Sequence, residues 1–240
     1  MARVGLFVPC FIDQLYPAVA RATLAVLERC GVRAEFDVRQ TCCGQPAFNS
    51  GCTAEAATLA RRFIATFAKY DAVVAPSGSC VSMVRHHYAG LAPDPSGVTR
   101  RVFELCEFLV TQLGRADVGA SFAARAALHM PCHLMRELGG AGHVRAVVAA
   151  VRGLTCVPLP TEAECCGFGG LFSVNYPELS CAMGEPKVRE LQAAGVDSLI
   201  SPESSCLMQL GGLLARRDAR LRVLHVAQVL AGDTGPEAAA

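Results

Sequence analysis

The sequence predicts an α/β protein made of two similar Rossmann-like modules, each built from parallel βαβ units and related by internal duplication. Two observations lead to this prediction. Short apolar runs of strand length alternate with longer segments of helical periodicity, which is the order typical of parallel sheets with right-handed crossovers. The same landmarks also recur about 120 residues apart in a chain of 240 residues. We expect the first module over residues 1–118 and the second over residues 119–240.

The duplication is visible at four landmarks that recur in the same order. The pairs of counterparts are VGLFVPC and AALHMPC, TCCGQPAF and ECCGFGGLF, APSGSC and SPESSC, and RVFELCEFL and RVLHVAQVL. The offset between counterparts stays between 121 and 126 residues. Chance matches rarely preserve order and spacing four times, so we interpret the chain as a tandem repeat whose unit has the size of an ordinary domain.

The first module begins with an apolar run over residues 3–8, which predicts a strand. Helical spacing of apolar side chains follows from Leu15 to Leu27, and Gly31 is the expected stop. Thr53 is the expected N-cap of the next long helix. The further predicted elements are a strand near 33–38, a Cys-Cys-Gly loop, the helix over 54–69, a strand over 71–76 and a helix that begins near Cys80.

The second module repeats this order of elements. The predicted elements are a strand over 126–130, a helix over 141–151, a strand over 154–157, a Cys-Cys-Gly loop, a helix over 177–194, a strand over 197–201 and a helix over 205–215. Because the carboxyl ends of parallel strands meet at one edge of a sheet, we expect the cysteine loops of each module to gather there as metal loops.

The composition excludes several classes of function. Lys and Arg number 22 against 21 Asp and Glu, a formal net charge of +1, and 52% of the residues are hydrophobic. Neither a disordered chain nor a polybasic nucleic-acid binder has this balance. No apolar run reaches the ~18 residues of a membrane-spanning helix, so we expect no direct membrane insertion. The apolar start of the chain imitates a signal peptide, but the same pattern recurs internally, and we expect a cytoplasmic protein.

Thirteen cysteines are the most unusual feature of the composition. Their number is odd and their share of the chain, about 5%, is below that of a disulfide scaffold, so metal binding, redox chemistry or packing is expected. Packing alone does not require the same Cys-Cys-Gly loop twice. We therefore predict that the eight repeated cysteines bind metal, four in each module: Cys10, Cys42, Cys43, Cys80, Cys132, Cys165, Cys166 and Cys206.

The kind of metal centre follows from the thiolate ligands and their crowding. Thiolates select zinc, copper(I) or iron–sulfur clusters. Adjacent cysteines can face one centre only where the chain bends, which Gly44 and Gly167 permit. A cluster of several irons tolerates such neighbours better than one tetrahedral ion does, which favours a 4Fe–4S cluster in each module. Four thiolates are also a complete structural zinc set, so zinc stays open, in particular in one module.

The remaining five cysteines are interpreted as packing residues. Cys30, Cys106 and Cys156 lie in apolar helical or strand contexts, where a buried cysteine acts as a small hydrophobic residue. Cys52 and Cys181 follow the two Cys-Cys-Gly loops at different distances and do not superpose in the repeat. Packing is expected for both, and a role as spare ligand remains open.

The histidines give weaker signals than the cysteines. His133 directly follows a repeated cysteine and is a candidate ligand or hydrogen-bond donor, although its counterpart is Phe11. His86 and His87, with Arg85, either offset the negative charge of a cluster or form a solvated helix face. No dinucleotide fingerprint accompanies the βαβ pattern, so no nicotinamide or flavin is expected. Two further histidines are expected only to make local hydrogen bonds: His129, and His225, whose counterpart is Glu104.

The cysteine segments resemble a known family. TCCGQPAFNSG, APSGSC, MPCH, CCGFGGLFSVNYPE and SPESSCLMQ are similar to the cysteine-rich CCG domain, duplicated over essentially the whole chain. The two-module form without a ferredoxin part most resembles the lactate utilisation protein A family, the small iron–sulfur subunits of a three-component L-lactate oxidation system. More distant relatives with the same motif are the CCG-containing subunit of heterodisulfide reductase and the iron–sulfur subunits of glycolate oxidase and anaerobic glycerol-3-phosphate dehydrogenase.

The last family cysteine is missing from both modules. In the heterodisulfide reductase relatives the pattern ends in C-x-x-C, and five thiols hold a non-cubane 4Fe–4S cluster. In this chain Met83 follows Cys80, and Gln209 follows Cys206, at that last position. The resemblance therefore implies an ordinary four-thiolate cluster, the non-cubane form, or a cluster in one module and zinc in the other. It also weakens any expectation of disulfide cleavage.

The function implied by the resemblance is that of an iron–sulfur electron-transfer subunit in a cytoplasmic complex that oxidises L-lactate to pyruvate. Its expected partners are a ferredoxin-type iron–sulfur subunit and a third subunit. Such a subunit need not bind the substrate, and no catalytic residue is assigned. The alternatives are a zinc-binding structural or scaffold protein, a CCG subunit of an oxidoreductase for glycolate, glycerol-3-phosphate or a heterodisulfide, and a stand-alone thiol enzyme with Cys10 or Cys132 as nucleophile.

Overall fold

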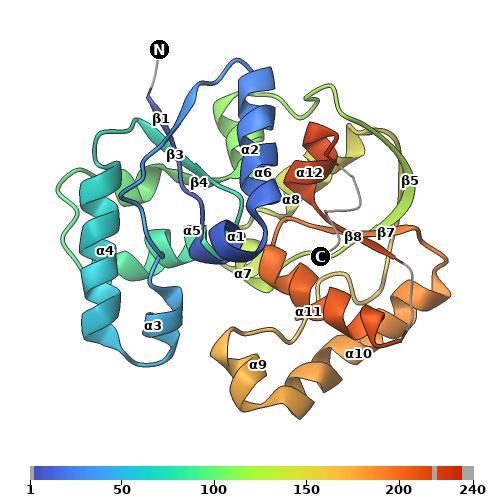
Figure 1. Cartoon of the computed structure of the whole chain (residues 1–240). Coiled ribbons are helices and arrows are strands. Elements are labelled where there is room, and N and C mark those ends of the chain that lie inside the picture. Colours follow the sequence, from blue (N-terminus) through green and yellow to red (C-terminus); the bar gives the residue numbers. More distant parts are fainter. Residues whose placement is uncertain (1–2, 218–220, 234–240) are drawn as a thin grey trace.

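The computed structural model describes residues 3–217 and 221–233. Within these residues, each half of the chain forms a four-stranded parallel sheet, with the strand order β2-β1-β3-β4 in the first half and β6-β5-β7-β8 in the second (Figure 1). This arrangement confirms the predicted α/β fold with one parallel sheet per module. The strands are β1 (Val4–Leu6), β2 (Ala34–Phe36), β3 (Ala72–Ala75), β4 (Val102–Glu104), β5 (Ser121–Leu128), β6 (Arg152–Val157), β7 (Ser198–Ser201) and β8 (Arg222–His225).

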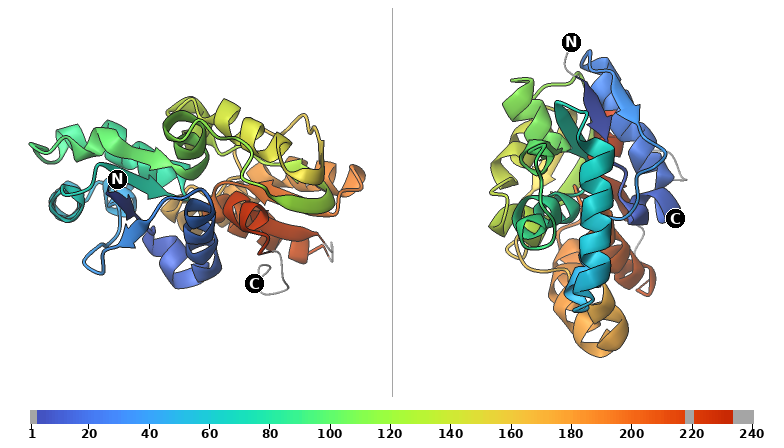
Figure 2. Two further views of the ribbon diagram at one scale, coloured as in Figure 1. Left: turned by 90° about the horizontal axis from the view of Figure 1, so that it is seen from above. Right: turned by 90° about the vertical axis from the view of Figure 1, so that its left-hand side faces the viewer.

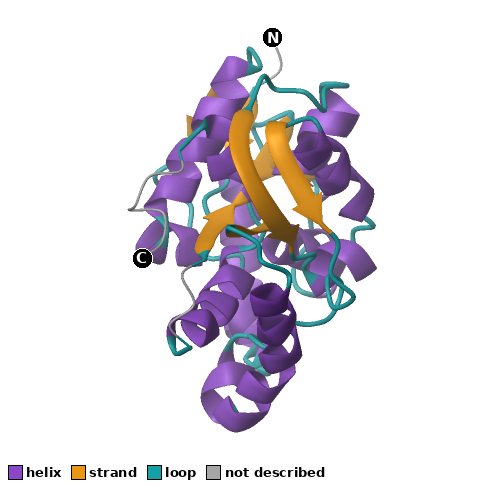
Figure 3. Ribbon diagram, turned by 90° about the vertical axis from the view of Figure 1, so that its right-hand side faces the viewer, coloured by secondary structure: helices purple, strands orange, loops and turns teal. Residues whose placement is uncertain are grey.

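Helices connect the strands, and Figure 3 shows them on both sides of the strands. The first half contains α1 (Cys10–Leu15), α2 (Pro17–Arg29), α3 (Gln45–Asn49), α4 (Thr53–Phe67), α5 (Gly78–Ser82) and α6 (Leu105–Glu107). The second contains α7 (Cys132–Arg136), α8 (Ala141–Ala149), α9 (Leu171–Asn175), α10 (Pro177–Ala193), α11 (Ser204–Ala215) and α12 (Val226–Ala231). Short π and 3-10 segments are η1 (Met83–His87), η2 (Tyr88–Gly90), η3 (Val98–Arg101) and η4 (Phe108–Gln112). Among the described helices, none combines the length and the apolar character needed to cross a membrane.

Backbone hydrogen bonds show which residues of the two halves are equivalent. The amide of Phe7 donates to the carbonyl oxygen of Val74 at 2.9 Å, and the amide of His129 donates to that of Ile200 at 2.8 Å. Both bonds continue the pairing between the first and third strands of a half, β1 with β3 and β5 with β7. Phe7 and His129 therefore occupy the same place in the repeat.

Several predicted boundaries differ from the structure. Thr53, the expected N-cap, is the first helical residue of α4, and Cys52 occupies the cap position. The run from Leu15 to Leu27 is divided between α1 and α2, because Pro17 begins a new helix at the position where proline is best tolerated. The strand expected from residue 126 begins earlier, at Ser121, because β5 pairs with β6 from that residue onward. Its small side chains hide the alternation that would have predicted this length. The helix predicted over 177–194 is observed as α10.

The two halves pack against each other through equivalent elements. Helix α2 contacts α12 and α8 contacts α6, while α1 contacts α11 and α7 contacts α5. In the repeat, α2 corresponds to α8, α6 to α12, α1 to α7 and α5 to α11. The contacts are thus reciprocal, as in a two-fold symmetric dimer, but they lie within one chain. The left panel of Figure 2 shows α2 (blue) and α12 (red) side by side at this boundary.

The hydrophobic core is partly shared by the halves. One cluster of buried side chains combines Val4 and Val26 of the first half with Leu134, Val144 and Leu230 of the second, among others. Two further clusters of buried residues each belong to a single half. The shared cluster holds the two sheets in a fixed relation and so fixes the edges at which the cysteine loops end.

Candidate metal centres

In each half, four repeated cysteines lie beyond the carboxyl ends of the strands. In the first half, Cys10 begins α1 after β1, Cys42 and Cys43 lie in the loop between β2 and α3, and Cys80 lies in α5 after β3. The same places after β5, β6 and β7 are taken by their counterparts, Cys132, Cys165, Cys166 and Cys206. Because parallel strands end at one edge, thiols that are distant in the sequence meet there.

The first thiol set consists of Cys10, Cys42, Cys43 and Cys80. The Sγ atom of Cys43 lies 3.4 Å from that of Cys80. Cys42 interacts with both Cys10 and Cys43, which lower the pKa of its thiol, so the four thiols form a connected series. Cys43 and Cys80 are buried, whereas Cys10 is exposed. The set therefore has a buried end and an end that is open to solvent.

The second thiol set consists of Cys132, Cys165, Cys166 and Cys206, and it repeats this arrangement. Cys165 interacts with Cys132 and Cys166, which lower the pKa of its thiol, and Cys166 interacts with Cys206. Cys166 and Cys206 are buried, and the other two are partly buried. The same order of contacts in both halves shows that the repeat preserves a constellation of thiols rather than isolated packing residues.

Glycine permits the bend that brings adjacent cysteines together. Gly44 and Gly167 have φ angles of 85° and 88°, in the left-handed region that favours glycine. Their amides donate to the sulfur atoms of Cys42 and Cys165, each at 3.4 Å. This geometry agrees with the expectation from the sequence. The two glycines were expected to let both side chains of a Cys-Cys pair face one centre.

Interactions within each thiol set lower the pKa of some thiols and raise the pKa of others. The pKa of Cys42 is lowered because Cys10 and then Cys43 donate hydrogen bonds to its sulfur. The pKa of Cys165 is lowered by its two neighbours in the same way. The hydrogen bond to Cys42 is also the first cause that raises the pKa of Cys43, followed by its bond to the next thiol and its burial. Such a mixture of thiolate and thiol groups suits a cation, which displaces the remaining protons when it binds.

Both thiol sets face one cavity of about 270 Å³, which all eight repeated cysteines line. Phe11 of the first half and Phe168 of the second also line it, and their rings meet edge to face with centroids 5.6 Å apart. This aromatic contact joins the halves beside the cavity. We refer to this space, between the two sets, as the shared cavity.

A buried carboxyl group, Glu203, crosses the boundary between the halves at the shared cavity. It accepts hydrogen bonds from Ser77 Oγ at 3.1 Å and from the amide of Ser79 at 3.0 Å. Ser77 Oγ in turn accepts a hydrogen bond from the amide of Cys80 at 3.3 Å. Burial raises the pKa of Glu203. This side chain of the second half thus supports the turn that positions a thiol of the first.

The five other cysteines do not all pack in the core. Cys106 is fully buried, which confirms its interpretation as a packing residue. Cys52 and Cys156 are exposed, so that interpretation is wrong for both: Cys52 directly precedes α4, and Cys156 lies on the edge strand β6. Cys30 and Cys181 are partly buried. None of the five is among the residues that line the shared cavity, so nothing supports a spare-ligand role for Cys52 or Cys181.

Three of the histidines and Arg85 make their contacts with residues outside the two thiol sets. His225 caps α12 by accepting an amide hydrogen bond at 3.1 Å, and Glu104 caps α6 in the equivalent way, as expected. His86 is exposed, and His87 packs on an aromatic ring of α3. Arg85 pairs at 2.9 Å with a carboxylate of α6 rather than with a thiol set. Only His86 fits the predicted solvated helix face, since Arg85 and His87 are partly buried, and none of these contacts supports charge compensation.

His129 is the residue whose importance the sequence reasoning missed. The backbone of Glu162 is close enough to influence the pKa of His129, but neither ring nitrogen has a partner at hydrogen-bonding geometry among the described residues, and the side chain is 1% exposed. A ring nitrogen of His129 and the sulfur atoms of Cys166 and Cys206 all lie within 4.8 Å of one another. The signal that could have identified His129 is the mismatch with apolar Phe7 at the same position of the repeat.

The other histidine near the thiols is His133, which lines the shared cavity. Its Nδ1 lies 3.7 Å from the sulfur of Cys132. The two residues that replace the last family cysteine lie elsewhere. Met83 is fully buried in the core of the first half, and Gln209 donates to Ser180 Oγ at 2.9 Å. Neither lines the shared cavity, so each set offers four thiols.

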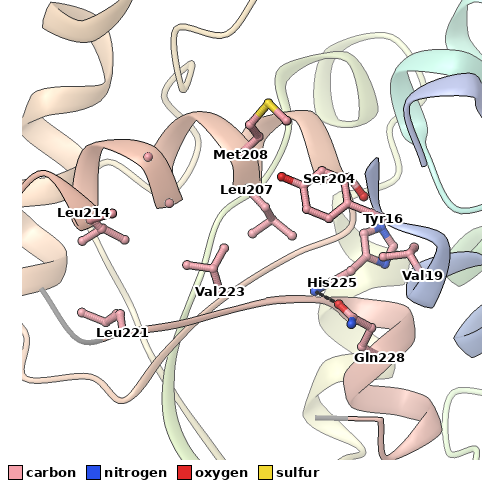
Figure 4. A pocket seen from close by; sticks show the side chains of 13 residues that line it. Tyr16, Val19, Ser204, Leu207, Met208, Leu214, Leu221, Val223, His225 and Gln228 are labelled. Carbon is pink, nitrogen blue, oxygen red and sulfur yellow. Dashed lines mark hydrogen bonds between the residues drawn. The ribbon is translucent and has the colours of Figure 1, made fainter. Parts of the chain in front are cut away.

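A second cavity, of about 430 Å³, lies between α2, α11, β8 and α12 (Figure 4). Its walls are mainly apolar and include Leu207, Leu214 and Val223. His225 and Gln228 lie at one end, where the side chain of Gln228 accepts a hydrogen bond from the His225 amide at 3.0 Å. No repeated cysteine lines this cavity, so the metal-binding chemistry belongs to the shared cavity.

The donor atoms of both sets fit a soft metal centre. Each set brings four sulfur atoms together, and the second adds a buried imidazole that lacks a hydrogen-bond partner in the described chain. Buried polar groups in proteins normally have a partner, and thiolate is the preferred ligand of zinc and iron–sulfur centres. The fold and the site thus define a duplicated thiolate domain. The family model that matches is CCG, the cysteine-rich domain, over residues 4–85 and 126–211.

Full-length relatives give the particular family. The chain is 42% identical to "Lactate utilization protein A" of Exiguobacterium sp. over 238 residues, which cover 96% of this chain and 97% of that protein. It is 41% identical to the protein of that name from Geobacillus kaustophilus over 234 residues, with 95% and 98% covered. The chain is 39% identical to the protein of that name from Bacillus subtilis over 234 residues, which cover 95% of this chain and 98% of that protein. The chain belongs to the lactate utilization protein A family.

Proposed function

We propose that this chain is the iron–sulfur electron-transfer subunit of a cytoplasmic complex that oxidises L-lactate to pyruvate. The observation that carries the proposal is the gathering of four thiols, twice, from loops that are distant in the sequence. The shared cavity between the two sets supports a chain of two redox centres. The relatives' name supports lactate as the substrate of the whole complex. An iron–sulfur cluster would supply one-electron transfer, and the residues of this chain would hold it and tune it.

The spread of the sulfur atoms favours a cluster over a single zinc ion. A tetrahedral zinc with bonds of about 2.3 Å needs all of its sulfur ligands within roughly 3.8 Å of one another. In the described structure, neither thiol set has all four sulfur atoms within even 4.8 Å of one another. The sulfurs instead form an extended series, which a centre of several irons accommodates better than one tetrahedral ion does.

The protein environment would tune the potential of each cluster. The amides of Gly44 and Gly167 already point at sulfur atoms, and hydrogen bonds to sulfur stabilise the reduced, more negative state. Burial of Cys43, Cys80, and their two counterparts limits solvent access at one end of each set. No residue of this chain is assigned to the chemistry of lactate itself.

An apolar surface supports docking of a ferredoxin-type iron–sulfur subunit, with a third subunit completing the complex. Many of the large exposed hydrophobic side chains of the described residues lie on α9 and the start of α10: Leu171, Val174, Tyr176, Leu179 and Met183. Leu171 also lines the shared cavity, so this surface adjoins the thiol sets. A partner seated there would lie close enough to exchange electrons with them.

Metal analysis of matched variants tests the proposal. Anaerobically purified protein should contain about four iron and four sulfide per thiol set. Cys80→Ser and Cys206→Ser should each remove about half of the iron and sulfide, because each breaks one set. Cys52→Ser is the control, because Cys52 is exposed and lies outside the shared cavity, and it should leave both contents unchanged. Zinc without sulfide would contradict the proposal and support a structural zinc protein.

A further inference from the structure

The two thiol sets have different surroundings at equivalent positions. Phe7 of the first half packs edge to face on Phe63, with ring centroids 5.0 Å apart. The same strand end in the second half carries His129. Helices α4 and α10 start at equivalent residues, Thr53 and Pro177, and in this register Phe63 corresponds to Lys187. An aromatic pair beside the first set is thus replaced by a histidine and a lysine beside the second.

Both polar residues are buried, and His129 lies next to thiols. His129 and Lys187 are each 1% exposed. The ammonium group of Lys187 donates to the carbonyl oxygen of Thr161 and is attracted by the charges of Cys166 and Cys206 when these are thiolates. A buried cation at this place would offset part of the negative charge that four thiolates bring to a metal centre. The surroundings of the second set are therefore suited to a bound anionic cluster.

The imidazole of His129 is not part of the hydrogen-bond network of the described residues. Neither ring nitrogen has a hydrogen-bond partner there, although an unpaired buried polar group destabilises a fold. A neutral imidazole has a free electron pair on one ring nitrogen. That is the form of histidine that binds metal ions. One ring nitrogen also belongs to the close group with Cys166 and Cys206.

We infer that His129 supplies a nitrogen ligand to the metal centre of the second thiol set. The inference rests on the proposed function, because it assumes a metal centre in that set. It makes the two centres chemically different: the first is held by thiolates alone, and the second by thiolates and one imidazole. Because imidazole is neutral, it stabilises the oxidised state less than thiolate does, so the second centre has the higher reduction potential.

Pulsed electron paramagnetic resonance on protein with ¹⁵N-labelled histidine tests the ligand directly. The loaded, reduced wild-type protein should show a strong nitrogen coupling that changes when ¹⁴N is replaced by ¹⁵N. His129→Phe gives this position the residue of the first half and should abolish the coupling, while the signal of the first centre stays unchanged. His133→Asn is the matched control, because His133 also lies near a thiol of this set, and it should keep the coupling.

Three outcomes would overturn the inference. They are the absence of a nitrogen coupling in loaded wild-type protein, a coupling too weak for a direct bond, and a coupling that His133→Asn removes but His129→Phe retains. The wild-type measurement decides the matter even if a variant fails to fold. Failure of the proposed function is seen separately, as protein without iron and sulfide. If zinc is bound instead, X-ray absorption at the zinc edge still reports whether nitrogen accompanies sulfur.

Discussion

At the scale of single residues, the carboxyl group of Glu104 combines burial with helix capping. The side chain is 1% exposed, and its Oε2 accepts hydrogen bonds from the amides of Cys106 and Glu107 at 2.8 and 3.2 Å. Its Oε1 has no partner among the described residues. Burial raises the pKa of Glu104 to about 8, although the backbone hydrogen bonds act in the opposite direction. The folded protein therefore keeps this carboxyl group protonated at neutral pH.

This raised pKa predicts a loss of stability as the pH rises. Between 4.5, the ordinary pKa, and about 8, the folded state holds a proton that the unfolded state has released. The free energy of unfolding should therefore fall across this window, by at most about 1.4 kcal/mol per pH unit for this group. Glu104→Gln should make the fall less steep. Urea unfolding at pH 5 and pH 8 measures the difference, with the exposed Glu28→Gln as control. Equal slopes in wild type and Glu104→Gln would contradict the prediction.

The sequence predicted the residues of the site only where both halves carry the same residue at equivalent positions. All eight cysteines of the thiol sets stand at matched positions, so comparison of the two halves identifies them. His129 breaks the match with Phe7, and a search for repeated features passes over such a residue. Glu203 was also missed, because its partners Ser77 and Ser79 are distant in the sequence and meet it only when the halves pack.

At the scale of elements, the Cys-Cys-Gly loops of the two halves differ in how well they accommodate a side chain at the glycine. A Cβ atom on Gly167 would lie 2.3 Å from the carbonyl oxygen of Ser180 in α10. A Cβ atom on Gly44 would meet nothing closer than Leu59 Cβ at 3.4 Å. The second loop is therefore packed more tightly against its helix than the first.

Alanine at the two glycines should separate backbone strain from steric conflict. Gly44→Ala should lower the free energy of unfolding by about 1–2 kcal/mol, the cost of a left-handed residue with a Cβ atom. Gly167→Ala should lower it further and should also reduce the metal content of the second set, because α10 must shift. Denaturant unfolding and metal analysis of both variants check this. If both variants lost the same free energy of unfolding and kept the same metal content, packing of the second loop against α10 would contribute nothing to either.

Element types were predictable, whereas several boundaries were not. The short apolar runs of β1, β3 and β7 predict strands, and the longer segment over 177–194 predicts the helix α10. The start of β5 was missed, since its alanines carry little apolar signal and the strand is extended by pairing with β6. The exposure of Cys156 was missed for a related reason: only the sheet order shows that β6 is an edge strand.

At the scale of the whole molecule, the shared hydrophobic cluster predicts that both halves unfold together. Leu134 of α7 is fully buried in this cluster, and its Cβ lies 2.8 Å from the position a Cβ on Gly78 of α5 would take. Leu134→Ala should lower the free energy of unfolding by about 2–5 kcal/mol and keep a single transition. Circular dichroism and tyrosine fluorescence should report the same midpoint.

The control for this prediction is Leu179→Ala, because Leu179 is 55% exposed and should contribute little to stability. Two separate transitions, of which Leu134→Ala moves only one, would show that the halves fold independently. The module boundary predicted between residues 118 and 119 falls between η4 and β5, and it stays a prediction until such a measurement is made. Sequence comparison of the halves reveals their likeness, but it contains no information on how they pack.

The covalent link between the halves has a consequence for how their residues could diverge. Two identical subunits around a two-fold axis must carry the same residue at each pair of related positions. Ser77 and Glu203 are such a pair in this chain, and identical subunits would set two carboxylates, or two hydroxyls, against each other where one hydrogen-bonded pair now stands. In a single chain with two copies of the domain, that constraint does not apply. Each half has been free to acquire its own polar residues, so a pseudo-symmetric frame holds two sites that need not be alike.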